Sequence, residues 1–418
     1  MTHQRDIVLL FATRIIRLFC YGFLSVVLAL YLAETGFDEK MIGLLFTLTL
    51  AGDAGITLWL TTHADQFGRR KTLLVGALLM VGAGAVFVIT NNIILLMAAA
   101  IIGVISPSGN EIGPFLSVEQ AGLSQLIPDK QRTKFFAWYN MVGSFATATG
   151  ALAGGWLAKI LNGNGMSQLE SYRVVLMGYG LGGILLLILF MGVSSAIEVT
   201  EIKTDVKKTL GLHRSRKVVF KLSALFALDA FAGGLVVQSM IAYWFHVKFG
   251  VDSGTLGSIF FGANVLAGIS ALLAVPLATR IGLINTMVFT HIPSNILLML
   301  VPLMPNLPLA IGILLLRFSI SQMDVPTRQS YTMAVVAPDE RSAASGVTAI
   351  ARSVGAAISP MLTGFSLAFH SCSMPRYSSP ADLRSFMTFY YSGNFALSNH
   401  RKKSRGEVTS PLLSVQQI

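Results

Sequence analysis

The stretch HADQFGRRKTLL, residues 63–74, places an acid, a glycine and three consecutive cations between two long apolar segments. Of the 418 residues, 53% are hydrophobic and 12% are charged, whereas a soluble globular protein carries about a quarter charged residues. In water, a chain of this composition would leave large apolar surfaces uncovered. A short cationic turn between apolar segments is typical of a loop at a membrane surface, so the sequence predicts residence in a lipid bilayer.

Apolar runs of about 20 residues, the length that crosses hydrocarbon as a helix, follow one another along the chain. We expect spans near residues 7–33, 41–63, 72–91, 93–126, 134–158, 174–196, 221–247, 255–278, 285–304, 308–336 and 343–370. The fourth and tenth runs are too long for one plain crossing. Residues 385–397 are the candidate for a twelfth span, but they are short and polar, so we expect this span to be degenerate or missing.

The polar segment EVTEIKTDVKKTLGLHRSRK, residues 198–217, divides the runs into two sets. The predicted organisation is an N-terminal transmembrane bundle (1–196), a cytoplasmic linker (197–220), a C-terminal bundle (221–384), and a degenerate last span with a polar tail (385–418). With the N-terminus inside, the inner turns collect most of the cations, which favours this orientation. The membrane itself, plasma membrane or organelle, stays open.

The chain resembles itself at a shift of about 210 residues. An offset of 214 pairs Gly43 with Gly257 and Gly68 with Gly282, and an offset of 209 places GALAGG (150–155) on SPMLTG (359–364). Each match lies at a predicted helix end or on a glycine-rich face. The repeats suggest two parallel halves of six spans each.

The loop between the second and third spans resembles that of the major facilitator superfamily of secondary transporters. Asp65, Gly68, Arg69 and Arg70 match the family's pattern, whereas Thr61 replaces its leading Gly and Gln66 its usual cation. The resemblance implies two pseudo-symmetric six-helix bundles and transport by alternating access. It also implies that Asp65 and Arg69 act as gate residues in a charge network between the halves, which breaks as the halves rock. Simple anchoring of the loop to the inner leaflet is the alternative.

The fifth span carries GALAGG where the family's proton antiporters often have Gly-Pro-x-x-Gly-Gly. The glycines at 150, 154 and 155 are present and the proline is missing. Close packing of helices explains such small residues about as well. The resemblance slightly favours efflux by antiport over the other directions of coupling.

Ionisable residues inside the predicted spans are costly and therefore indicate function. The predicted spans contain five acids and five arginines: Asp53, Glu111, Glu119, Asp229 and Asp324, and Arg14, Arg17, Arg317, Arg328 and Arg352. Equal numbers predict a neutral interior in which the charges pair. For each residue, a static ion pair is the alternative to a functional role.

These charges are assigned different expected roles. We expect Asp53, Glu111 and Asp324, the deepest acids, to include the group that binds and releases the coupling proton. Arg317 and Arg352 are candidates for receiving an anionic group of the substrate or for holding a neighbouring acid ionised. We expect Glu119 and Arg328, nearest the inner end, in structural pairs, with the loop cations as candidate partners.

Prolines and glycines predict breaks in two corresponding spans. Pro107 and Pro114, with nearby glycines, are expected to break the fourth span near Asn110 and Glu111, and Pro326 to break the tenth beside Asp324. Matching breaks favour a central site between the halves, with Asn110 among its residues. The isolated His246 and His291 are expected in packing or interface positions.

The predicted function is secondary active transport of a small solute, coupled to protons. An uncoupled facilitator and a transporter-fold sensor that binds without translocating are the alternatives. No ATP-binding loop, nucleophile–base pair or metal-ligand set stands out, so neither enzyme activity nor a cofactor is expected. The expected partners are the lipid bilayer, the solute and protons, with no nucleic acid because the cations cluster in turns. We expect a monomer.

Overall fold

The computed structural model describes residues 2–111, 113–198, 214–336 and 341–373, and these residues form helices and connecting segments without a strand. The first half contains α1 (Thr2–Ser25), α2 (Leu28–Glu34), α3 (Glu39–Phe67), α4 (Arg69–Ile89), α5 (Ile93–Ile102), α6 (Phe115–Leu126), α7 (Asp129–Gly163), α8 (Gln168–Gly192) and the 3-10 turn η1 (Ser195–Ile197). The predicted all-α fold is confirmed. The candidate last span, 385–397, lies outside the described residues.

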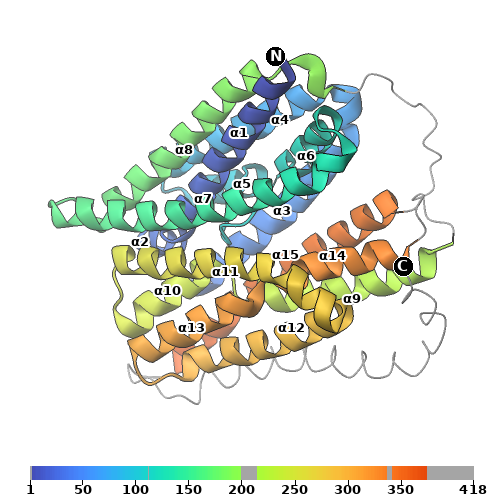
Figure 1. The fold of residues 1–418 in the computed structure, drawn as a ribbon. Helices are drawn as coiled ribbons and strands as arrows, with labels where there is room; N and C mark the ends of the chain where they lie inside the picture. Colours follow the sequence, from blue (N-terminus) through green and yellow to red (C-terminus); the bar gives the residue numbers. More distant parts are fainter. Residues whose placement is uncertain (1, 112, 199–213, 337–340, 374–418) are drawn as a thin grey trace.

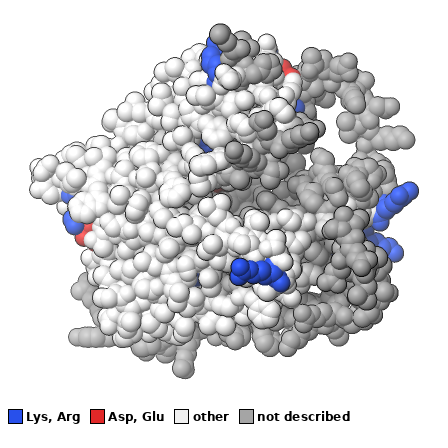
Figure 2. Space-filling view, viewed as in Figure 1, with Lys and Arg blue, Asp and Glu red and all other residues white. Residues whose placement is uncertain are grey.

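The described part of the second half repeats the order of the first five spans, with α9 (Arg216–Gly234), α10 (Gln238–Phe249), α11 (Ser253–Ile281), α12 (Leu283–Leu300), η2 (Val301–Leu303), α13 (Leu307–Ser321), α14 (Asp324–Val335) and α15 (Arg341–Ser373). Within the described residues, eight segments are long and apolar enough to cross a membrane. The face in Figure 2 is largely uncharged wherever its residues are described, as a surface in contact with lipid must be.

The helices form two bundles that meet at one end and diverge at the other (Figure 1). We call the end where α3 finishes and α9 begins the linker end, and the end where α7 turns into α8 and α10 into α11 the far end. In the first bundle α1 packs against α7 and α8, and in the second α15 packs against α9. The bundles contact each other chiefly through α7 with α11 and through α3 with α15.

Both contacts between the bundles depend on glycine. A Cβ on Gly155 of α7 would lie 2.3 Å from the Ser253 carbonyl oxygen of α11, and one on Gly43 of α3 would lie 2.5 Å from the Pro360 carbonyl oxygen of α15. The facing glycines are Gly257 and Gly364, so each crossing pairs two glycines. These four residues are the ones that the internal repeat pairs by sequence, and the two crossings are therefore related by the pseudo-twofold symmetry of the fold.

Four of the spans that the structure describes are broken. The predicted breaks in spans four and ten are confirmed: α5 ends at Ile102 and α6 begins at Phe115, and α13 ends at Ser321 before α14 begins at Asp324. Spans one and seven are also interrupted, between α1 and α2 and between α9 and α10, although each reads as one continuous apolar run in the sequence.

The extra breaks expose backbone groups that join the two bundles. The Ser239 hydroxyl at the start of α10 lies 2.6 Å from the Ser25 carbonyl and 2.6 Å from the Pro107 carbonyl. The backbone N–H of Ser239 also donates to the Pro107 carbonyl, at 3.0 Å. The Gln238 amide donates to the Ser25 hydroxyl at 2.8 Å. Because carbonyls freed by a helix break need partners in a membrane interior, the breaks in spans one, four and seven satisfy one another.

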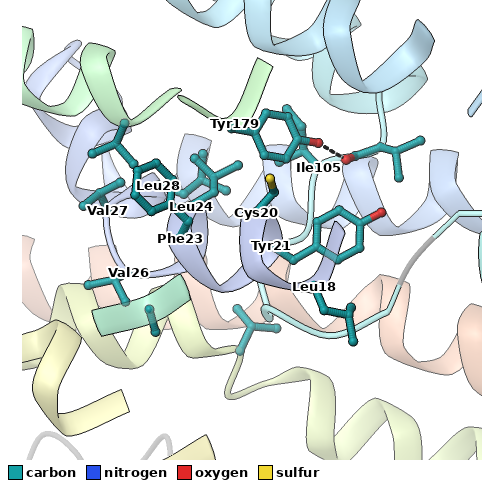
Figure 3. Packing of buried hydrophobic residues seen from close by; sticks show 14 of the residues in the cluster. Leu18, Cys20, Tyr21, Phe23, Leu24, Val26, Val27, Leu28, Ile105 and Tyr179 are labelled. Carbon is teal, nitrogen blue, oxygen red and sulfur yellow. Dashed lines mark hydrogen bonds between the residues drawn. The ribbon is translucent and has the colours of Figure 1, made fainter. Parts of the chain in front are cut away.

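A buried cluster of apolar side chains holds the break of span four in place. Figure 3 shows Cys20, Leu24 and Tyr21 of α1 packed beside Ile105 of the break and Tyr179 of α8. The Tyr179 hydroxyl donates a hydrogen bond to the Val104 carbonyl, which α5 leaves free where it ends. The break is therefore a packed feature with satisfied backbone groups.

Candidate functional site

The first bundle contains a closed network of charges between α1 and span four. Arg14 and Arg17 each donate to one oxygen of Glu111 at 2.7 Å. Arg17 also makes a two-pronged contact with Glu119, with both nitrogen–oxygen distances at 2.8 Å. The side chains of Arg17 and Glu119 are fully buried. Two cations and two acids are thereby brought together, as equal numbers in the sequence led us to expect.

Neutral donors and acceptors complete this network. Glu119 accepts further hydrogen bonds from the Thr13 hydroxyl at 2.8 Å and from the Tyr139 hydroxyl. Arg14 donates to the Tyr139 carbonyl at 2.8 Å and to the Asn140 side chain at 3.2 Å. Glu119 thus lies in a buried ion pair, as expected, but its partner is Arg17 of α1 and not a loop cation.

Asp53 of α3 lies apart from these arginines and accepts from neutral groups. Its Oδ1 lies 2.6 Å from the Gly113 backbone N–H in the break of span four and 3.2 Å from the Thr57 hydroxyl. This carboxyl therefore links span two to the broken span four. Asn110, in the same break, is exposed, and its backbone carbonyl accepts from the Ser106 hydroxyl.

The second bundle gathers a looser cluster from four helices. Arg328 of α14 places Nη1 2.9 Å from Asp324 and 3.3 Å from Asp229 of α9. Arg352 of α15 lies 3.5 Å from the same Asp229 oxygen. Arg328 therefore forms its ion pairs within its own bundle, with Asp324 and Asp229.

His291 of α12 belongs to this cluster, so the expectation that it packs as an isolated histidine is wrong. Its Nε2 lies 2.9 Å from Asp229 and its Nδ1 lies 3.8 Å from Asp324. Together with Phe226, Met287 and Arg328 these residues line a pocket with about 220 Å³ of empty space, its open mouth included. His246, by contrast, contacts the Val251 carbonyl of the adjacent loop at 2.9 Å, as a packing residue would.

Arg317 of α13 contacts an aromatic ring. Its guanidinium lies 4.6 Å from the centre of the Phe318 ring. The sequence groups Arg317 with Arg352 as candidate receptors for an anion, and the structure places Arg352 3.5 Å from Asp229.

The loop that joins α3 to α4, residues 65–71, which we call the signature loop, closes onto the first residues after α8. Gly68 has a φ of 101°, a conformation that glycine adopts at little cost, and the N–H groups of Arg69 and Arg70 that follow it donate to the Glu198 carboxylate at 2.7 and 3.1 Å. Arg69 also donates to the Ile197 carbonyl, and Arg70 donates to the Met191 carbonyl at the end of α8. The side chain of Asp65 lies outside the described residues.

At the far end, polar contacts join α7 to the start of α11. Lys159 lies 3.3 Å from Asp252, and the Trp156 indole donates to Ser258 at 3.0 Å. On the symmetry-related crossing, Thr47 of α3 accepts from the backbone N–H of Met361 at 2.7 Å. The GALAGG glycines also pack here: a Cβ on Gly150 would lie 2.0 Å from the Phe19 carbonyl oxygen of α1.

Comparisons with known proteins agree with this fold. A profile of the Major Facilitator Superfamily matches residues 10–360. The uncharacterized membrane protein YJR124C of Saccharomyces cerevisiae is 31% identical over 392 residues, which cover 86% of this chain and 88% of that protein.

Solved transporters share the fold at low sequence identity. A bacterial homologue of the lysosomal transporter Spinster, in an inward-facing and occupied conformation, superposes with a TM-score of 0.68 at 17% identity and covers 89% of this chain and 83% of its own. The nucleoside transporter NupG gives a TM-score of 0.71 at 13% identity, over 94% of this chain and 98% of its own. The chain is thus a multi-pass integral membrane transporter that belongs to the Major Facilitator Superfamily.

Proposed function

We propose that this transporter moves a small solute by alternating access between its two bundles and couples the movement to protons. The bundles are residues 1–196 and 221–384, with the linker end in the cytoplasm. The far-end contacts between α7 and α11 and between α3 and α15, together with the divergence at the linker end, support a conformation that opens towards the linker side (Figure 1).

The environment of Asp53 carries the proposal of proton coupling. Glu111 lies between two arginines, and Asp324 lies beside Arg328, so a proton on either acid would compete with a cation. Asp53 instead accepts from the Gly113 N–H and the Thr57 hydroxyl, both neutral. A partly buried carboxylate whose hydrogen-bond donors are neutral gains more from taking up a proton than one paired with a cation does.

The position of Asp53 supports a role in conformational change as well. Its hydrogen bond to Gly113 connects α3, which forms one of the two crossings between bundles, to the break that leads into Glu111. Protonation would weaken that bond, because a neutral carboxyl accepts a hydrogen bond less strongly than a carboxylate. A proton at Asp53 would thus loosen α3 from span four.

The signature loop supplies the second part of the proposal. Arg69 and Arg70 bind Glu198 and the end of α8 in this conformation. We propose that Asp65 and Arg69 exchange some of these contacts for contacts with the other bundle when the linker end closes. Gly68 keeps the turn tight in both states.

The direction of coupling is a separate question. The GALAGG element slightly favours antiport, but its glycines also fit close packing of α7 against α1 and α11. The proposal therefore includes proton coupling and leaves its sign to measurement.

Proteoliposomes test the proposal. A panel of radiolabelled metabolites and drugs is assayed at two opposite pH gradients, and a solute whose accumulation follows the gradient is then used for variants. Asp53→Asn is expected to abolish accumulation while exchange of solute across the membrane continues. Asp38→Asn, at the exposed start of the same helix, is the matched control and is expected to transport normally. Gradient-driven accumulation that Asp53→Asn leaves unchanged would refute the role of Asp53.

A further inference from the structure

The first two residues of α10, Gln238 and Ser239, make buried hydrogen bonds to the first bundle. The first N–H groups of a helix have no partner within it, and the N–H of Ser239 donates to the Pro107 carbonyl at 3.0 Å. The Ser239 hydroxyl lies 2.6 Å from the carbonyls of Ser25 and Pro107, and we assign its single proton to Ser25 because Pro107 already accepts the N–H. One residue of the second bundle thereby supplies a donor to each of two broken spans of the first.

Gln238 extends these contacts into a chain of donors that runs from α11 to α1. The Asn264 amide donates to the Gln238 oxygen at 3.2 Å, and the Gln238 amide donates to the Ser25 hydroxyl at 2.8 Å. The Ser25 hydroxyl in turn donates to the Gly22 carbonyl at 2.8 Å. Because every bond in this chain points the same way, each group polarises the next, and the chain acts as a unit.

The equivalent helix of the first bundle begins with apolar side chains. The first two residues of α2 are Leu28 and Ala29, both fully buried, and α2 packs against α10. The donors at this junction therefore come from the second bundle, and the acceptors, the carbonyls of Ser25 and Pro107, come from the first. Both acceptor residues are buried, so bulk water does not reach a carbonyl whose donor is lost while the bundles are together.

We propose that Gln238 and Ser239, with Ser25 and Pro107, form a gate that holds the far end closed. The far end opens only if α10 leaves α2 and the breaks of spans one and four, which disrupts these bonds between the bundles. Opening admits water to the two carbonyls, and water satisfies them nearly as well as Ser239 does. The donors therefore stabilise the closed state alone. This inference rests on the proposed alternating access and adds to it the residues that set the balance between the two states.

Distances between pairs of spin labels on the purified full-length protein test this inference, measured by double electron–electron resonance in a background without native cysteines. The far-end pair, Glu34→Cys with Val247→Cys, labels exposed positions on the outer parts of spans one and seven. The linker-end pair, Val8→Cys with Lys217→Cys, labels exposed positions on the inner parts of the same spans. The two pairs therefore report on the two ends of one pair of spans.

Three variants are compared on these labels. Ser239→Ala is expected to raise the ratio of long to short far-end distances about fivefold, the factor that one ordinary hydrogen bond carries, and to shift the linker-end pair to shorter distances. Gln238→Leu should shift both pairs in the same sense by a smaller factor, because Ser239 keeps its bonds. Ser223→Ala is the matched control and should change neither pair, since this buried hydroxyl of α9 has no hydrogen-bond partner among the described residues.

The opposite movement of the two pairs separates a gate from a loss of packing. Broadening of both distance distributions in Ser239→Ala would indicate a structural role alone and overturn the inference, as would distributions that neither gate variant changes. If Ser239→Ala does not fold, Gln238→Leu provides the same test. The measurement needs neither solute nor a pH gradient, so its failure is distinct from a failure of proton-driven accumulation in proteoliposomes.

Discussion

The two bundles place an ion pair between equivalent spans but reverse its polarity. In the first bundle the arginine lies on span one and the acid on span four, as Arg17 and Glu119. In the second, the acid lies on span seven and the arginine on span ten, as Asp229 and Arg328. Both halves of the fold therefore place an ion pair between these two spans, but the span that carries the arginine differs between them.

The two pairs also differ in how completely they are satisfied. Arg17 and Glu119 are fully buried, and every oxygen of Glu119 has at least two donors. Asp229 is instead shared among Arg328, Arg352 and His291 beside an open pocket. A filled network resists change, whereas a shared acid can exchange partners, so we interpret the first cluster as structural and the second as adjustable.

The largest expected effect is on the first pair. Glu119→Gln leaves the Arg17 guanidinium buried with half of its compensation removed, which is expected to destabilise the protein by about 3–5 kcal/mol. Thermal unfolding in detergent measures this. The double variant Arg17→Met with Glu119→Leu should regain most of the loss. If the single variant is as stable as the unmodified protein, the first cluster is not structural.

Substitutions at the glycine crossings test where the two halves are alike. Gly155→Ala is expected to cost about 1–3 kcal/mol, because its Cβ must displace the backbone of α11. Gly43→Ala should cost a similar amount at the symmetry-related crossing. Gly163→Ala, which has no neighbour within 4 Å of the new Cβ, is the control. Solvent accessibility of cysteines introduced at the far end should rise in both crossing variants, and a rise in one alone would contradict their equivalence.

The corresponding change in the second cluster should be smaller. Asp324→Asn is expected to cost about 1 kcal/mol, because Arg328 keeps Asp229 as a partner and only one charged hydrogen bond is lost. The same unfolding assay compares it with Glu119→Gln. Equal losses in the two variants would remove the distinction between a structural and an adjustable cluster.

The smallest expected effect concerns the bridge between Lys159 and Asp252. Partial burial opposes ionisation of Asp252, but hydrogen bonds from the Thr255 N–H and hydroxyl, together with Lys159, hold its pKa below the usual range. The stabilisation is present above the ordinary carboxyl pKa and is lost as the pH falls through the lowered value. Because the pair is exposed, this should amount to about 0.3 kcal/mol. We expect acid to raise slightly the solvent accessibility of cysteines introduced at the far end, and Asp252→Asn to remove this rise. If the rise persists in Asp252→Asn, groups other than Asp252 cause it.

Much of the architecture was predictable from the sequence because it depends on local patterns. Apolar run lengths predicted the spans, and Pro107 and Pro114 predicted the break of span four. The repeat paired Gly43 with Gly257, and each of these glycines lies in its own crossing between bundles. Small residues at equal offsets report a symmetric contact even before the contact itself is known.

The pairing of charges was less accessible to sequence reasoning. Counting predicted neutrality, but the partner of each charge depends on how far each helix is rotated, which a single sequence does not fix. His291 was missed for this reason: its acids come from α9 and α14, and they are distant in sequence. The break at Val26 and Val27 has no proline to announce it, and the contacts that stabilise it come from the other bundle.

The anchorage of Glu198 has a consequence for how the chain can be divided. Since Glu198 caps the start of α4 and Ile197 is buried against the first bundle, these residues travel with that bundle as one rigid body. Two separately expressed fragments should therefore reassemble when the chain is cut after residue 198. A cut a few residues earlier would remove Ile197 and Glu198 from the first fragment. The N–H groups of Arg69 and Arg70 would then lack the Glu198 carboxylate that they bind in the intact chain.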